Sequence, residues 1–186
     1  IHWNNWPGSI NFKLASNGSI INEQAAYEVD LDALSGSFNH LPLSGSAKVI
    51  AKNNKIKIQP SLIVLGKNRL QAQGTLGKTL NLNWDAAIQQ LNVFDKQATG
   101  QILSKGTVTG SAKQPKLQGN INITSLKLLG LTVKSFAAQA NADFYQAQPS
   151  LISIQGKNIA YQNFHADSLN LSLAGNNKQQ TGKFSM

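Results

Sequence analysis

The stretch Thr79-Leu-Asn-Leu-Asn-Trp-Asp-Ala-Ala-Ile88 carries the pattern that decides the fold. Apolar side chains alternate with mostly polar ones from its first residue to its last. Successive side chains of a β-strand point to opposite faces, so this alternation makes one face apolar and the other polar. The apolar face carries Leu80, Leu82, Trp84, Ala86 and Ile88. The stretch therefore predicts a β-strand with one face turned away from water.

The same alternation recurs along most of the chain. It is seen at 25–33, 47–52, 55–59, 69–76, 120–124, 136–144 and 168–173. Turn-forming pairs such as Asn17-Gly18, Asn53-Asn54 and Gly110-Ser111 lie between these runs. Strands at this spacing predict an all-β fold, a meandering antiparallel sheet with little or no helix. Residues 93–104 fit a loop or a short helical turn before the next hairpin, and Pro60 is expected to end or bend its strand.

The composition favours a sheet with one polar face. Charged residues make up 13% of the 186 residues, about half the usual share. Asn and Gln supply about a fifth of the chain. The net charge is +9, almost all from Lys, with Arg69 as the single Arg. Lysines at sheet edges oppose aggregation; a weak attraction to anionic lipid headgroups is the functional alternative. Few aromatic residues and one Arg argue against nucleic-acid binding.

No arrangement of residues predicts catalysis or metal binding. His2, His40 and His165 are far apart, and none has a metal-ligand neighbour at the usual spacing. The carboxylates Glu28 and Asp30 share a strand face with a third, but period-two alternation explains that spacing and predicts a solvated face. The chain has no cysteine. We therefore expect neither an enzyme nor a metal or cofactor.

The apolar face of the strands needs a cover. A second sheet, closure into a barrel, or a curled sheet with an apolar inner groove would each provide one. An open groove would be a binding site, because soluble proteins rarely leave a large apolar surface bare. The alternative is a closed core of the same residues. The residues expected to line a groove are Leu80, Leu82, Trp84, Ile88, Ile121, Ile123, Phe136 and Phe144.

The middle of the chain resembles a known family. The segments that show the resemblance are Leu65-Gly-Lys-Asn-Arg-Leu-Gln-Ala-Gln-Gly-Thr-Leu-Gly77, Leu80-Asn-Leu-Asn-Trp84, Gly100-Gln-Ile-Leu-Ser-Lys-Gly-Thr-Val-Thr-Gly110 and Pro115-Lys-Leu-Gln-Gly119. In this order they are similar to the TamB family of AsmA-like envelope proteins, the inner-membrane subunits of the translocation and assembly module. The resemblance covers about three quarters of the chain.

The resemblance implies a fold, a location and a role. Residues 1–186 would form a single segment of a β-taco, an elongated curled sheet with an apolar interior, cut from a longer periplasm-spanning protein. The parent would be anchored in the bacterial inner membrane, with this chain internal or C-terminal, and would pair with the outer-membrane barrel TamA. It would shield phospholipid acyl chains between the two membranes and support assembly of outer-membrane proteins such as autotransporters.

Two other readings of the chain stay open. A scaffold could capture the strands of client proteins at its sheet edges. A plain structural β-sandwich would have a closed, dry core and bind neither lipid nor client.

Overall fold

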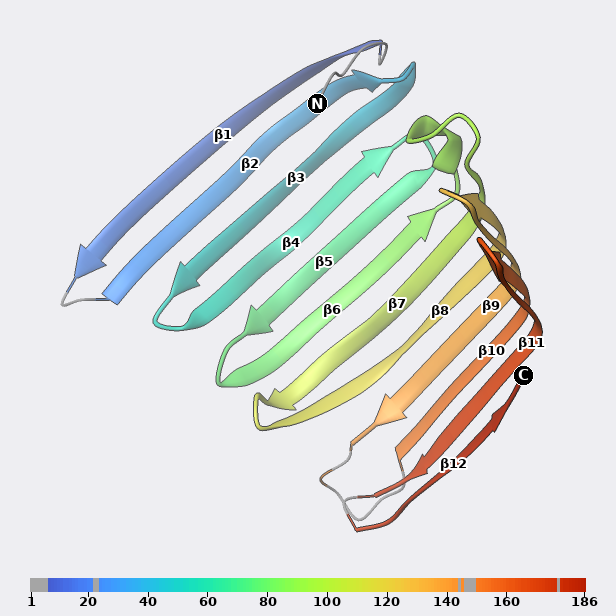
Figure 1. Ribbon diagram of the computed structural model, residues 1–186. Coiled ribbons are helices and arrows are strands. Elements are labelled where there is room, and N and C mark those ends of the chain that lie inside the picture. The colour runs from blue at the N-terminus through green and yellow to red at the C-terminus, as the bar shows by residue number, and fades with distance from the viewer. Residues whose placement is uncertain (1–6, 22–23, 144, 146–149, 177) are drawn as a thin grey trace.

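The computed structural model describes residues 7–21, 24–143, 145, 150–176 and 178–186. They form one antiparallel sheet of 12 strands in which every strand pairs with its neighbours in the chain (Figure 1). The strands are β1 Gly8–Ile21, β2 Gln24–Phe38, β3 Leu41–Lys52, β4 Lys55–Leu65, β5 Asn68–Leu76, β6 Thr79–Ile88, β7 Thr99–Ser111, β8 Gln114–Leu128, β9 Leu131–Ala142, β10 Ser150–Tyr161, β11 Phe164–Gly175 and β12 Gln180–Ser185.

This architecture confirms the predicted all-β antiparallel fold, and β6 has the bounds of the strand expected at 79–88. The curl of the sheet into a taco stays a prediction. One 3-10 turn, η1 at Leu91–Val93, is the only helical element among the described residues. The prediction of a loop or helical turn at 93–104 is wrong for its second half. There β7 has already begun, because Ile102 pairs with Ile88 and continues the ladder.

Two-residue turns join most neighbouring strands. Asn39-His40 and Asn53-Asn54 have φ values of 50° and 64°, and of 52° and 55°. Two consecutive left-handed residues are the mark of the tight turn whose twist matches a hairpin, and Asn tolerates that conformation well. The turns therefore follow from the local sequence and fix the register of the strands beside them.

Bulges keep the apolar residues on one face where the alternation breaks. In β2 the register shifts between Leu31 and Leu34, where Ala33 has φ 52°. In β4 it shifts between Ile58 and Ser61, so Pro60 interrupts the ladder without ending the strand. An extra residue at each bulge returns the following side chains to the face they would otherwise leave.

The sheet has a small core for its size. The accessible surface of the chain is 12705 Å², whereas a compact protein of 20.0 kDa would expose about 8,700 Å². One cluster of buried apolar residues forms the core, made of Leu91, Ala98, Leu126 and Val133. The excess surface belongs to a sheet whose faces lie largely open to solvent.

Candidate functional site: the apolar face of the sheet

The strand register brings the predicted lining residues onto one face. Directly paired residues of an antiparallel ladder project to the same side of the sheet. Ile88 pairs with Ile102, Ile102 with Ile123, and Ile123 with Phe136. Ile121 lies two residues before Ile123 in β8 and so shares this side. The row crosses four strands, so residues far apart in the sequence form one surface.

The remaining predicted residues follow from β6. Leu80, Leu82 and Trp84 alternate with polar residues in register with Ile88, so they lie on the same face. The predicted lining residues that the structure describes are all half-buried. Phe144 lies outside the described residues. Contact of these side chains with lipid stays a prediction, but their common face is a property of the fold.

The same face continues toward the N-terminus, beyond the residues we expected. Leu82 pairs with Gly74, which continues through Ile58 and Val49 to Val29. Val29 is 43% exposed, and Leu70 and Tyr27 on the same side are 48% and 54% exposed. Alternation had marked these runs as strands, but only the register of five strands shows that they extend the same surface.

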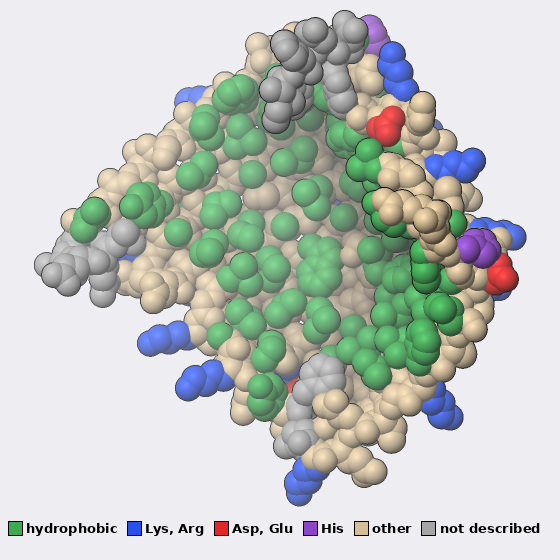
Figure 2. Space-filling model, in the orientation of Figure 1, with side chains coloured by type: hydrophobic (Ala, Val, Ile, Leu, Met, Phe, Trp, Pro, Cys, Tyr) green, Lys and Arg blue, Asp and Glu red, His purple; other side chains and the backbone are tan. Residues whose placement is uncertain are grey.

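Figure 2 shows this surface directly. Hydrophobic side chains spread across the viewed face of the sheet, and Lys and Arg side chains project at its margins. The register agrees, because the strand lysines alternate with the apolar row; Lys105, for example, pairs with Asp85 and Asn120 on the opposite face. The molecule therefore presents an apolar face bordered by cations.

Trp84 lies flat on the sheet instead of pointing away from it. Its indole crosses Gly106, where a Cβ atom would lie 2.5 Å from the ring carbons Cζ2 and Cη2. A Cβ atom at Gly119 would lie 3.3 Å from Cζ2. The indole N–H donates a hydrogen bond to Ser104 Oγ at 3.0 Å. Trp84 thus covers backbone that the two glycines leave bare, and its polar atom is satisfied.

Part of the face is covered by the chain itself. After β6, residues 89–98 fold back, and Leu91 and Val93 become 6% and 3% exposed. Leu91 packs with Leu126 and Val133 of β8 and β9 in the buried cluster. We call residues 89–98 the cover segment. It packs on the apolar face at one end of β7–β9. It also reaches the β2–β3 and β4–β5 turns, where Asn39 Nδ2 donates to the Val93 carbonyl at 3.3 Å and the Lys67 N–H donates to Gln90 Oε1 at 2.6 Å. The middle of β2–β5 stays open.

A buried asparagine holds the cover segment in place. Asn68, at the start of β5, is 4% exposed. Its Oδ1 accepts hydrogen bonds from the N–H groups of Gln89 and Gln90 at 2.9 and 2.8 Å. Its Nδ2 donates to the Gln90 carbonyl at 3.1 Å. These three hydrogen bonds fix the direction in which the segment leaves β6.

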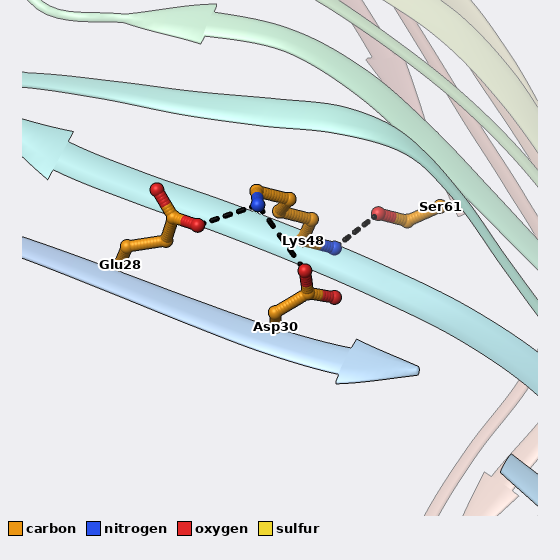
Figure 3. A network of polar contacts seen from close by, with 4 residues as sticks. All are labelled: Glu28, Asp30, Lys48 and Ser61. Atoms are coloured by element: carbon orange, nitrogen blue, oxygen red, sulfur yellow. Dashed lines mark hydrogen bonds and ion pairs between the residues drawn. The ribbon is translucent and has the colours of Figure 1, made fainter. Parts of the chain in front are cut away.

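The opposite face carries charge networks. Lys48 Nζ lies 2.5 Å from Glu28 Oε1 and 3.1 Å from Asp30 Oδ2 (Figure 3). The hydrogen bonds that Lys48 Nζ donates to Glu28, and then to Asp30, raise the pKa of Lys48. The backbone N–H of Lys48 donates to Ser61 Oγ at 3.3 Å beside the β4 bulge. Two acidic side chains of β2 thus form ion pairs with Lys48 of β3 on the polar face.

No arrangement among the described residues suits a metal ion, since none groups three or more His, Asp or Glu side chains. In the part of the chain that the structure describes, no helix has the length and apolar character needed to cross a membrane.

Comparison with known proteins gives this sheet a family. The sequence model described as "TamB, N-terminal domain" matches residues 1–186. The chain belongs to the TamB family. This confirms the resemblance, and it places the chain in a structural and transport family of the bacterial cell envelope. The position of this segment within its parent protein, expected to be internal or C-terminal, stays a prediction.

A relative supports the match at low identity. An uncharacterized protein of Buchnera aphidicola subsp. Acyrthosiphon pisum is 23% identical over 122 residues. The match covers 66% of this chain and 13% of the Buchnera protein, so the chain spans a small part of that relative's length. No solved structure matches this TamB-family chain.

Proposed function

We propose that the apolar face of this TamB-family domain shields phospholipid acyl chains in the periplasm, on a route between the inner and outer membranes. The parent protein would be anchored in the inner membrane and would act with the outer-membrane barrel TamA, also in the assembly of outer-membrane proteins. One observation carries the proposal. Apolar side chains form a continuous face from β2 to β9. Over β2–β5 five of them are exposed by 36–54%: Tyr27, Val29, Val49, Ile56 and Leu70.

The chemistry of such a face suits an acyl chain. Burying a methylene group stabilises a complex by about 0.8 kcal/mol, and no specific polar partner is needed. Apolar rows at a strand spacing of about 4.8 Å give a surface that a flexible hydrocarbon can follow. A face of this kind would hold lipids that differ in tail length.

Photo-crosslinking in cells tests the proposal. A photoreactive amino acid replaces Leu70, which is 48% exposed on the apolar face. The matched control replaces Gln73, exposed on the opposite face of the same strand. Leu70 is a better probe site than Trp84, whose removal would uncover glycine backbone. We expect phospholipid bound at position 70 and not at 73. Equal capture at both, or none at 70 in a folded protein, would rule out the shielding role.

The edges of the sheet support a second candidate function. Among the described strands, β1 and β12 each have a neighbour on one side only. Unpaired backbone groups at such an edge can add a strand from another protein. If the protein captures client strands, a probe at Phe12 of β1 (60% exposed) will crosslink to protein. The lipid function predicts that Leu70 is the productive position.

A further inference from the structure

One margin of the apolar face carries a row of lysines at adjacent hairpin tips. Lys52 and Lys55 flank the turn between β3 and β4, and Lys78 and Lys113 lie in the next two turns along this margin. We call these four lysines the basic rim. All four are exposed, and neighbouring tips are about 10 Å apart, the width of two strands.

The tips of the basic rim lie side by side. A Cβ atom at Gly77 would be 3.0 Å from the Asn54 carbonyl oxygen and 3.2 Å from Lys55 Cα. The Ala112 N–H donates to the Lys78 carbonyl at 3.0 Å. The three turns therefore form one continuous edge, with a positive charge at each tip.

Nothing acidic in the described structure neutralises this edge. The described ion pairs of the lysines involve Lys48 and Lys116, not the rim residues. Asp143 is already bound to Lys116 at 2.7 Å. Within the described residues, the lysines of the basic rim therefore form no ion pair.

The basic rim meets the apolar face in a hollow. A cavity of about 410 Å³ opens at the first two tips, and its walls include Ala51, Ile56 and Leu76 together with Lys52 and Lys55. Ala51 pairs with Ile56, and Ile56 with Leu76, so these apolar walls belong to the apolar face. Ile56 is 41% exposed. The hollow is therefore lined by apolar side chains and by the two lysine residues of the hairpin tip beside them.

We propose that the basic rim binds the phosphate of anionic phospholipids whose acyl chains lie on the apolar face. This deepens the proposed function and rests on it. A ligand that satisfies both walls must join a hydrocarbon tail to an anionic head within one molecule, which a phospholipid does and a soluble anion does not. Lysine ammonium groups bind phosphate oxygens by charge-assisted hydrogen bonds. The domain would thus prefer acidic headgroups over zwitterionic ones while it tolerates different tails.

The test compares two lipids with identical acyl chains. The natural-length protein, with a photoreactive residue at Ile56, is mixed with vesicles of phosphatidylglycerol or of phosphatidylcholine at low ionic strength. We expect more crosslinking to phosphatidylglycerol, by roughly fivefold for each lysine in contact with the headgroup. Added salt should reduce the preference, because the charges are exposed.

Two variants that lose the same number of positive charges distinguish headgroup binding at the basic rim from a general attraction between the cationic protein and anionic vesicles. The rim variant K52Q/K55Q/K78Q/K113Q should bring the two lipids to near-equal yield. The control K105Q/K134Q/K157Q/K183Q removes four exposed lysines that lie outside the basic rim and should keep the preference. Lipid crosslinking at Leu70 reports that each variant is folded.

The outcomes also separate this inference from the proposed function. Equal crosslinking yields for the two lipids in the wild type would contradict headgroup binding by the basic rim. An equal loss of lipid preference in both variants would contradict it too. Neither result would affect the proposal that the apolar face shields acyl chains. Lipid at Leu70 without lipid at Ile56 has the same meaning. No lipid at either position would remove both proposals.

Discussion

Over β2–β5 the apolar face is open, whereas over β7–β9 the cover segment lies on it. Tyr27 and Leu70 are 54% and 48% exposed on the open part, while Leu126 and Val133 on the covered part are 4% and 6% exposed. Both parts use the same alternation and the same hairpin geometry. The difference comes from ten residues after β6 that fold back in one part and have no counterpart in the other.

This difference assigns separate tasks to the two parts. Burial of apolar area is the main source of stability, so the covered part holds the sheet together. The open part keeps apolar area exposed, which costs stability and leaves it available to a ligand. In this domain the core and the proposed binding surface therefore lie next to each other on the same face of the sheet.

Truncation of a leucine on each part should give the largest contrast. Leu126→Ala removes a buried side chain from the only buried apolar cluster of the described residues and should cost about 2–5 kcal/mol. Leu70→Ala removes a half-exposed side chain and should cost less than about 1 kcal/mol. Native-state hydrogen exchange of the β8 and β5 amides measures both values. Similar costs would mean that the open part also has a core.

Release of the cover segment should have the next largest effect. Asn68→Ala removes three hydrogen bonds from a buried site, and the opening free energy of the Gln89 and Gln90 amides should fall by about 1–3 kcal/mol. Hydrogen exchange at these amides reads the change. The exposed Asn122 offers a matched control, since Asn122→Ala removes an amide without a hydrogen bond to the cover segment. If Asn68→Ala leaves the exchange of both amides unchanged, Asn68 does not hold the segment.

Trp84 lies between the two parts and should show an intermediate effect. Trp84→Ala uncovers the backbone at Gly106 and Gly119 and should cost about 1–2 kcal/mol. Trp84→Phe keeps an aromatic ring over the glycines and loses the hydrogen bond to Ser104, at about 1 kcal/mol or less. Hydrogen exchange of the β7 amides measures the loss of stability in each of the two variants. Equal costs for Phe and Ala would show that the hydrogen bond, not ring coverage, matters here.

Much of this fold could be read from the sequence, because alternation and turn residues are local. The pattern at 79–88 gave both bounds of β6. Period two assigned Ile121, Ile123 and Phe136 to a face before their pairing was known, and register then joined that face to β6.

The cover segment could not be predicted, because its structure depends on distant residues. Leu91 and Val93 lie in a run without clear periodicity, and they become buried only when β8 and β9 are in place. The role of Asn68 likewise requires Gln89 and Gln90 to return to the start of β5. The extent of the open face toward Val29 was missed for a similar reason, since several registers must be known at once.

The smallest expected effect tests how the open part keeps its register without a core beneath it. Lys48 joins β3 to Glu28 and Asp30 of β2, and these partners raise its pKa above 10.5 in the folded chain. A group whose pKa is raised by folding stabilises the fold below its unfolded pKa, and this stabilisation is lost as the pH rises through the folded pKa.

As the pH rises above about 10, Lys48 loses its proton, and this loss should lower the melting temperature of the wild type. We call this contribution to the decline the Lys48 component. Lys48→Met should remove this component. Lys183→Met removes an exposed lysine without an ion pair among the described residues and should retain it. Circular-dichroism melts between about pH 8 and 11 measure all three proteins. The side chains of the network are partly exposed, so high salt should shrink the component. An unchanged pH slope in Lys48→Met would mean that the turns and bulges alone set the register of β2 and β3.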